Sequence, residues 1–310
     1  METGHTPVMK KEIEQFLISS LPDKAIVVDA TLGAGGHAEC LLKHLASHGG
    51  RLIAFDMDKQ SLEQARQRLA EYGNALVCVN ENFANIAAVL LRLGIDKING
   101  LVADLGISSM QVDNGERGFS FQSPGPLDMR MGESAPRTAA EIVNTYSEEE
   151  LFRIIKTYGE ERWSRRIVRR IIFERENAPI TTTDRLADII IKAVPVRFRY
   201  KSKIHPATRT FQALRMEVNE ELDSLEQLLE DMGAILAPGG RAAIISFHSL
   251  EDRMVKQVFR ELKKTGEFEI LTKKPLTADE EEIDENRRAR SAKLRVIEKT
   301  KGGFHEQTQK

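Results

Sequence analysis

The sequence predicts an α/β fold: a Rossmann-like parallel sheet with an inserted, mostly helical second domain. Between residues 25 and 106, apolar β-branched runs alternate with segments whose apolar residues recur at helical spacing, which is typical of a parallel sheet with right-handed crossovers. From about Gly106 to Ala207 the alternation stops, and glycine- and proline-rich loops and helical segments replace it. We therefore expect a discontinuous sheet domain, residues 1–106 and 208–310, and an inserted domain, residues 107–207.

The first part of the sheet domain contains four predicted strands. The first ends at Asp29, the second at Asp56 and the fourth at Asp104. After the first strand, a glycine-rich turn leads into a helical stretch that ends at residue 45. Further helices are predicted over residues 59–73 and 83–94, because leucine and alanine recur there at helical spacing.

The second part of the sheet domain continues the alternation. Residues 217–236 and 250–264 are predicted helices, and residues 239–249 form a fifth strand. Residues 268–274 and 292–299 are predicted to be two final strands in an antiparallel pair.

Composition excludes several classes of protein. The chain has 310 residues, of which 41% are hydrophobic and 30% charged, with a net charge of −2, so we expect an ordinary soluble protein whose global charge indicates no partner. Cys40 and Cys78 suggest no disulfide framework, and the histidines show no metal-ligand spacing, so no metal site is expected. Because neither a signal peptide nor a membrane-spanning run is evident, the cytoplasm is the expected compartment and no membrane partner is expected.

Three close glycines follow the first strand. Gly33, Gly35 and Gly36 precede a helix, and glycine lets a ligand approach the main chain while the helix start offers unpaired N–H groups. Gly33, Gly35 and Ala38 also fit the pattern G-x-G-x-x-A of dinucleotide-binding turns. The alternative is a tight turn that binds nothing.

Acidic residues end two further strands. Asp56 lies roughly 20 residues after the glycines, where a carboxylate binds ribose hydroxyls in nucleotide-binding folds. Asp104 ends the fourth strand at the same edge of the sheet, where a methyltransferase often has an acidic residue between cofactor and acceptor. We therefore expect Gly35, Asp56 and Asp104 to meet in one crevice. The alternative for each aspartate is to cap the following helix.

Basic residues dominate one segment of this nearly neutral chain. Between Asp188 and Glu217 there is no acidic residue. The seven basic residues are Lys192, Arg197, Arg199, Lys201, Lys203, Arg209 and Arg215, interleaved with Phe198, Tyr200, His205 and Phe211. Cations neutralise phosphates and aromatic faces stack on bases, so the segment indicates RNA binding; a solvated charged face is the alternative.

Two further stretches have open interpretations. A helical cluster would enlarge the RNA surface, or its arginines would pair with nearby glutamates; it contains Arg162, Arg165, Arg166, Arg169 and Arg170. At the end of the fifth strand stand Ser246, His248, Ser249 and Asp252. Their spacing does not support a hydrolase triad. They are expected to line the crevice, with Ser249 as a helix cap in the alternative interpretation.

Several motifs closely resemble those of the bacterial RsmH (MraW) family. The resemblance spans nearly the whole chain, and its most specific part is the run that begins at His205. The matching stretches are HTPVM at 5–9, DATLGAGGH at 29–37, DLGISSMQVD at 104–113, RGFSF at 117–121, GPLDMRM at 125–131, HPATRTFQALRMEVN at 205–219 and SFHSLEDR at 246–253. One departure is Arg287, which stands where the family often has proline.

The resemblance implies a Rossmann-like methyltransferase that uses S-adenosylmethionine. Members methylate the N4 amino group of a cytidine in the decoding region of 16S ribosomal RNA, so the expected partner is 16S rRNA within the small ribosomal subunit. The residues implied to bind the cofactor are Gly35, Gly36, His37, Asp56, Phe83, Asp104 and Gln111. Asp104 is also the candidate catalytic residue, and a homodimer is an open alternative to a monomer.

Two rival functions use only part of these signals. A nicotinamide-dependent oxidoreductase explains the glycine turn and Asp56 but gives no task to the DLGISS segment that starts at Asp104. A non-catalytic RNA-binding assembly factor explains the basic segment but leaves the crevice without a ligand.

Overall fold

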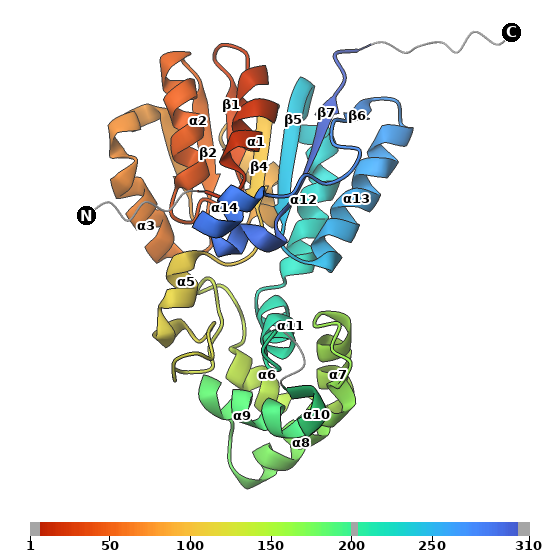
Figure 1. The fold of residues 1–310 in the computed structure, drawn as a ribbon. Coiled ribbons are helices and arrows are strands. Elements are labelled where there is room, and N and C mark those ends of the chain that lie inside the picture. Colours follow the sequence, from red (N-terminus) through yellow and green to blue (C-terminus); the bar gives the residue numbers. More distant parts are fainter. Residues whose placement is uncertain (1–6, 200–203, 303–310) are drawn as a thin grey trace, which may run out of the picture. The chain divides into compact units, whose positions relative to one another are not determined.

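The computed structural model describes residues 7–199 and 204–302, and it divides into two compact units (Figure 1). The first unit combines Met1–Gly106 with Asp223–Lys310, and the second is Ile107–Leu222. The sequence placed the end of the insertion at 207, but the insertion continues to Leu222. The reason is helix α11 (Thr208–Val218), whose Phe211 and Leu214 are buried in the helical core of the insertion.

The first unit contains a seven-stranded sheet in the order β3-β2-β1-β4-β5-β7-β6. The strands are β1 (Ile26–Asp29), β2 (Arg51–Phe55), β3 (Leu76–Val79), β4 (Ile98–Asp104), β5 (Leu236–Ser246), β6 (Phe268–Ile270) and β7 (Lys293–Lys299). Strands β1 to β5 pair in parallel, and β7 pairs antiparallel with both β5 and β6. The predicted parallel sheet and its antiparallel final pair are therefore confirmed.

The order of strands reverses between β1 and β4. Strands β2 and β3 continue to one side of β1, whereas β4 and β5 continue to the other. In open α/β sheets the crevice outside the carboxyl ends of the strands at such a reversal is where ligands bind. The residues that end β1 and β4 are Asp29 and Asp104.

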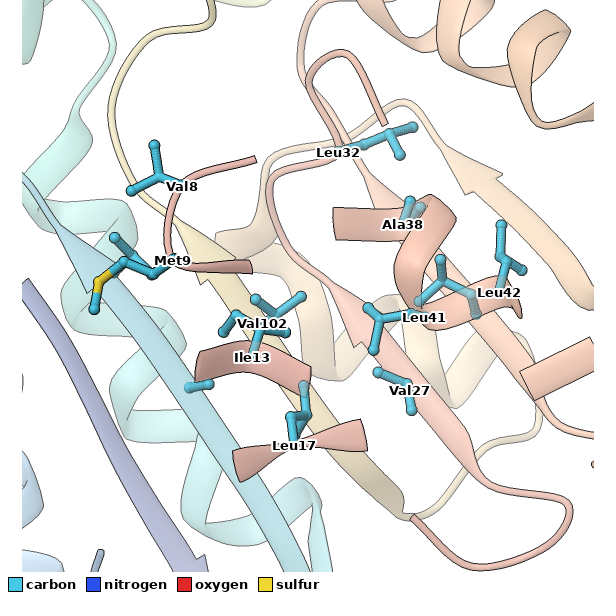
Figure 2. Close-up of a cluster of buried hydrophobic side chains, with 14 of the residues drawn as sticks. Val8, Met9, Ile13, Leu17, Val27, Leu32, Ala38, Leu41, Leu42 and Val102 are labelled. Atoms are coloured by element: carbon cyan, nitrogen blue, oxygen red, sulfur yellow. The ribbon is translucent and has the colours of Figure 1, made fainter. Parts of the chain in front are cut away.

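Helices cover both faces of the sheet because successive strand residues point to opposite sides. Val27 of β1 packs with α1 (Lys10–Phe16), α2 (Gly36–Ser47) and α3 (Lys59–Arg68). Figure 2 shows this core, with Ile13 of α1, Leu17 just after that helix and Leu41 of α2 gathered against the sheet. Val28 packs on the other face, with α4 (Ile86–Arg92), α12 (Glu221–Ile235) and α13 (Ser249–Lys264). A short helix, α14 (Glu280–Glu285), precedes β7.

The second unit is mostly helical, as predicted, and it has its own hydrophobic core. Besides α11, its helices are α5 (Ser109–Asp113), α6 (Ala139–Thr145), α7 (Glu148–Thr157), α8 (Ser164–Asn177), α9 (Thr183–Ala193) and α10 (Val196–Arg199). Capping boxes at Thr138 and Ser147 start α6 and α7 by satisfying backbone N–H groups. Buried residues of α7, α8 and α9 pack together, among them Ile154, Ile167 and Ile190.

In the described ranges, no helix is both long and apolar enough to span a membrane.

Candidate functional site

The glycine turn connects β1 to α2 and leaves the start of the helix open. Gly35 is the N-cap of α2 with φ 81°, a left-handed conformation that favours glycine. The turn closes through a 2.8 Å hydrogen bond from Gly35 N to the Leu32 carbonyl. A Cβ on Gly36 would lie only 3.0 Å from Cβ of Pro7, so a larger residue here would crowd Pro7. The first N–H groups of α2 have no acceptor within the helix and suit an anion.

Asp56 joins this turn to the end of β2. Its carboxylate accepts hydrogen bonds from Gly33 N at 2.8 Å and from Asp58 N at 2.8 Å. The Asn80 amide, just after β3, donates to the Asp56 carbonyl at 2.9 Å. The N-cap of α3 is Asp58, which accepts from Gln60 N at 3.0 Å. The alternative in which Asp56 caps α3 is therefore wrong.

Three charged side chains gather where the strand order reverses. His37 Nε2, on the first turn of α2, lies 3.6 Å from Asp104 Oδ2. Thr31 connects the two strand ends, since its N–H donates to Asp29 Oδ1 at 3.0 Å and its hydroxyl accepts from Asp104 N at 2.6 Å. Neither Asp29 nor Thr31 was predicted from the sequence to belong to the site. The sequence feature that could have identified Asp29 is an acidic residue at the end of the first strand.

This cluster contains buried polar atoms that lack hydrogen bonds. Asp29 is 1% exposed and His37 is 6% exposed. Within the described chain, Asp29 Oδ2, Asp104 Oδ1 and both ring nitrogens of His37 have no hydrogen-bond partner. Buried polar atoms are normally paired. Their grouping at the reversal indicates a place for a polar ligand.

Burial and mutual charge shift the protonation of the cluster. Burial raises the pKa of Asp29 to about 6, and the nearby carboxylates of Asp104 and Asp56 act in the same direction against His37 and the Thr31 N–H. Burial lowers the pKa of His37, but Asp104 and Asp29 outweigh it, so the net pKa of His37 is raised. The cluster is acidic overall and favours a cationic group.

The other two residues implied to bind the cofactor lie on short elements. Phe83 starts a single helical turn after β3, where it is half-buried at the edge of the core. Asn82 fixes this turn, because its side chain accepts from Ala84 N at 2.9 Å and donates to Ser224 Oγ at 2.8 Å. Gln111 belongs to the second unit, where it is buried and forms a capping box with Ser108 at the start of α5.

The polar run at the end of β5 is tied to separate partners. His248, not Ser249, is the N-cap of α13, so the alternative interpretation of Ser249 as the cap is wrong. The buried Glu251 carboxylate accepts from Phe247 N at 2.8 Å and from His248 N at 3.2 Å. Asp252 instead accepts from Arg295 of β7 at 2.7 Å. These contacts hold the end of the strand in place and do not form a hydrolase triad.

The basic residues predicted to bind RNA have different environments. Arg199 donates to the Val194 carbonyl at 2.9 Å, and Arg209 donates to the Glu160 carbonyl at 3.3 Å. Arg215 forms a two-pronged ion pair with Glu221 at 2.7 and 2.8 Å. Arg197 is exposed. Lys201 and Lys203 lie outside the described residues.

The arginines of the second cluster, on and just before α8, also have different environments. Arg170 pairs with Glu174 at 2.6 Å, as the pairing interpretation expects, whereas Arg169 lies 3.7 Å from Glu148 on another helix, α7. Arg166 donates to the Ala193 carbonyl at 3.1 Å. Arg162 and Arg165 instead lie over aromatic rings.

Comparison with known proteins identifies close relatives. Residues 2–300 match the model of the MraW methylase family. A protein of Carboxydothermus hydrogenoformans is 48% identical, covering 96% of this chain and 99% of the relative. Proteins of Geobacter sulfurreducens and Clostridioides difficile are 49% and 45% identical, each covering 96% of this chain and 100% of the relative. All three relatives are named ribosomal RNA small subunit methyltransferase H.

Proposed function

Because the chain belongs to the MraW methylase family, we propose that it methylates the N4 amino group of a cytidine in the decoding region of 16S ribosomal RNA, within the small ribosomal subunit. Its methyl donor is S-adenosylmethionine. The observation that carries the proposal is near full-length similarity to relatives named for the small-subunit rRNA. The N4 position and the decoding region rest on the resemblance of the motifs to the RsmH family.

The residues at the strand reversal fit S-adenosylmethionine. Its ammonium and sulfonium groups are cationic, and the carboxylates of Asp29 and Asp104 supply negative charge, with Asp29 Oδ2 a buried acceptor that has no partner among the described residues. Its carboxylate suits the open N–H groups of Gly36 and His37 at the start of α2. Asp56 would hold the ribose hydroxyls, since a carboxylate offers about four acceptor positions, and Phe83 would lie beside the adenine. When bound, this cofactor supplies a methyl group on a positively charged sulfur.

Asp104 is the residue that we assign to the reaction. The N4 lone pair of cytosine is delocalised into the ring, so the amine is a weak nucleophile and must be oriented. The Asp104 side chain is 26% exposed and its Oδ1 has no partner in the described chain. Accepting a hydrogen bond from the amino group would localise the lone pair and stabilise the positive charge that develops on nitrogen. His37 would keep the carboxylate oriented.

The target base must leave any duplex before it can react. A paired and stacked cytidine hides its amino group, so the enzyme requires a base that is flipped out or already unpaired. Residues of the insertion that bind the RNA backbone would hold the strand while the base enters the crevice.

The first experiment is methylation with labelled cofactor. The protein is incubated with methyl-labelled S-adenosylmethionine and either free 16S rRNA or small subunits from a strain that lacks the modification, and the labelled nucleoside is identified after digestion. We expect label on N4 of a cytidine in the subunits. Label on another nucleoside, or on none while the cofactor binds, would overturn the proposal.

A thermal-shift titration tests the two rival functions. Stabilisation by S-adenosylhomocysteine but not by NAD contradicts an oxidoreductase. Absence of stabilisation by either compound would favour the non-catalytic assembly factor.

A further inference from the structure

Two arginines and two aromatic rings form a cluster where α8 begins and where α10 lies, two labelled helices of the insertion (Figure 1). We call Arg162, Trp163, Arg197 and Phe198 the arginine–aromatic platform. The Arg162 guanidinium lies 4.6 Å from the ring centre of Trp163 and 4.6 Å from that of Phe198. Arg197 lies 4.7 Å from the Phe198 ring, and the two ring centres are 5.3 Å apart.

The platform presents its cations to solvent. Arg162 and Arg197 are exposed and the two rings are half-buried. Val196, next to Arg197, is a large apolar side chain that is 68% exposed. Arg165, the second residue of α8, is exposed and lies 5.1 Å from the ring centre of Phe152 on α7. The start of α8 and α10 therefore combine exposed guanidinium groups with aromatic and apolar surface.

The guanidinium groups of this surface have no carboxylate partners in the described part of the chain. Arg162, Arg165 and Arg197 contact rings, whereas Arg215 and Arg170 are held by glutamates. The nearby Glu161 is buried, and its carboxylate accepts a hydrogen bond from Trp163 N at 2.7 Å. A ring attracts a cation through its π electrons without using the N–H donors. Each guanidinium is thereby oriented while its hydrogen-bonding fork stays available.

We propose that the arginine–aromatic platform binds single-stranded RNA, with Arg162 and Arg197 on phosphates and a base stacked against the platform. The inference rests on the proposed function, which makes RNA the substrate. Arginine forks match phosphate oxygens, and both guanidinium planes and aromatic rings stack on unpaired bases. The combination of unpaired cations with stacking surface favours RNA over an acidic protein, which offers charge without bases.

Trp163 makes the test direct, because it is the single tryptophan of the chain. The full-length protein is titrated with a short unstructured RNA oligonucleotide and with an abasic strand of the same length and charge. We expect the RNA to quench Trp163 fluorescence and to bind more tightly, since only the RNA can stack. Equal quenching and affinity for both strands would overturn the base contact. Equally strong quenching by polyglutamate would assign the platform to an acidic protein instead.

Charge variants test the phosphate contacts. Each of Arg162→Gln and Arg197→Gln should reduce the slope of log affinity against log salt by about 0.7, the contribution of one phosphate contact on a single strand. Phe198→Ala keeps Trp163 and should weaken the quenching. The matched control is Arg51→Gln at the start of β2, an exposed arginine of the other unit, which should leave slope and quenching unchanged. Unchanged slopes in both platform variants would overturn the phosphate contacts.

The experiments distinguish failure of the platform proposal from failure of the proposed function. Subunits that are methylated normally by the Arg162→Gln and Arg197→Gln variants, together with absent quenching, would refute the platform and leave the function standing. Quenching and salt slopes as expected, together with no methylation by the wild-type protein of subunits that lack the modification, would refute the function and leave the RNA surface.

Discussion

The carboxyl edge of the sheet and the arginine–aromatic platform of the insertion use charge in opposite ways. At the sheet edge Asp29 and His37 are buried, have polar atoms that lack hydrogen-bond partners among the described residues, and have raised pKa values. On the insertion Arg162 and Arg197 are exposed and, among the described residues, contact aromatic rings rather than carboxylates. Buried charge of the first kind suits recognition of one small cofactor, whereas exposed charge of the second kind suits a long polyanion.

The largest expected effect comes from the sheet edge. Asp104→Asn keeps the shape of the side chain but removes its charge, so the methyl-transfer rate at saturating cofactor should fall by about 10²- to 10⁴-fold. The measurement is single-turnover methylation of subunits, with cofactor affinity determined separately. Asp96→Asn, an exposed aspartate just before the other end of β4, is the control and should keep the full rate. A normal rate in Asp104→Asn would contradict the catalytic assignment.

The next effect tests cofactor binding. Asp56→Ala removes the proposed ribose acceptor, and because hydrogen bonds to charged groups contribute about 1.5–3 kcal/mol, affinity for S-adenosylhomocysteine should fall about 10- to 100-fold. Isothermal titration calorimetry gives the value. The neighbouring Asp58→Ala removes the cap of α3 instead, which should lower the free energy of unfolding by about 1 kcal/mol and leave the affinity intact. Equal affinities in wild type and Asp56→Ala would remove Asp56 from the ribose role.

The sheet edge could be predicted because topology determines it. Parallel strands place their carboxyl ends on one edge, so a run of apolar residues that ends in an acid locates a site residue without coordinates. This reasoning identified Asp56 and Asp104 but gave Asp29 no role. What distinguishes Asp29 is its burial and its unpartnered oxygen, and both depend on how α2 packs against β1.

The sequence alone could not separate the basic residues that have partners within the protein from those that remain available to RNA. Arg199, Arg209 and Arg215 stand in the same run as Arg197, but backbone carbonyls or Glu221 hold the first three. Long side chains find partners that are distant along the chain, as Arg209 does at Glu160. Composition therefore indicates that the insertion is basic but does not indicate which arginines remain available. The predicted domain boundary at 207 was wrong for a similar reason, since only packing shows that α11 belongs to the insertion.

The raised pKa of Asp29 makes the free energy of unfolding depend on pH. Its pKa is about 6 in the folded protein and 3.8 is the ordinary value, so the folded state binds the proton more tightly. Raising the pH from about 4 to about 6 should therefore cost stability, on the order of 2 kcal/mol. Asn cannot ionise, so Asp29→Asn should remove that loss. Urea unfolding at a series of pH values, followed by circular dichroism, compares the two proteins; parallel pH profiles would contradict the shifted pKa.

The smallest effect separates structural from RNA-binding arginines within the insertion. Arg215 and Glu221 are only 13% and 12% exposed, so Arg215→Ala leaves a largely buried carboxylate unpaired and should lower the free energy of unfolding by about 2 kcal/mol. Trp163 lies in the same unit and reports this unfolding by fluorescence. The salt slope of RNA binding should stay unchanged, in contrast to Arg162→Gln, which should alter the slope and leave stability intact. A reduced salt slope without loss of stability would contradict this structural role. It would mean that Arg215 contacts phosphates, as the sequence predicts, and that its ion pair with Glu221 is not needed to keep the insertion folded.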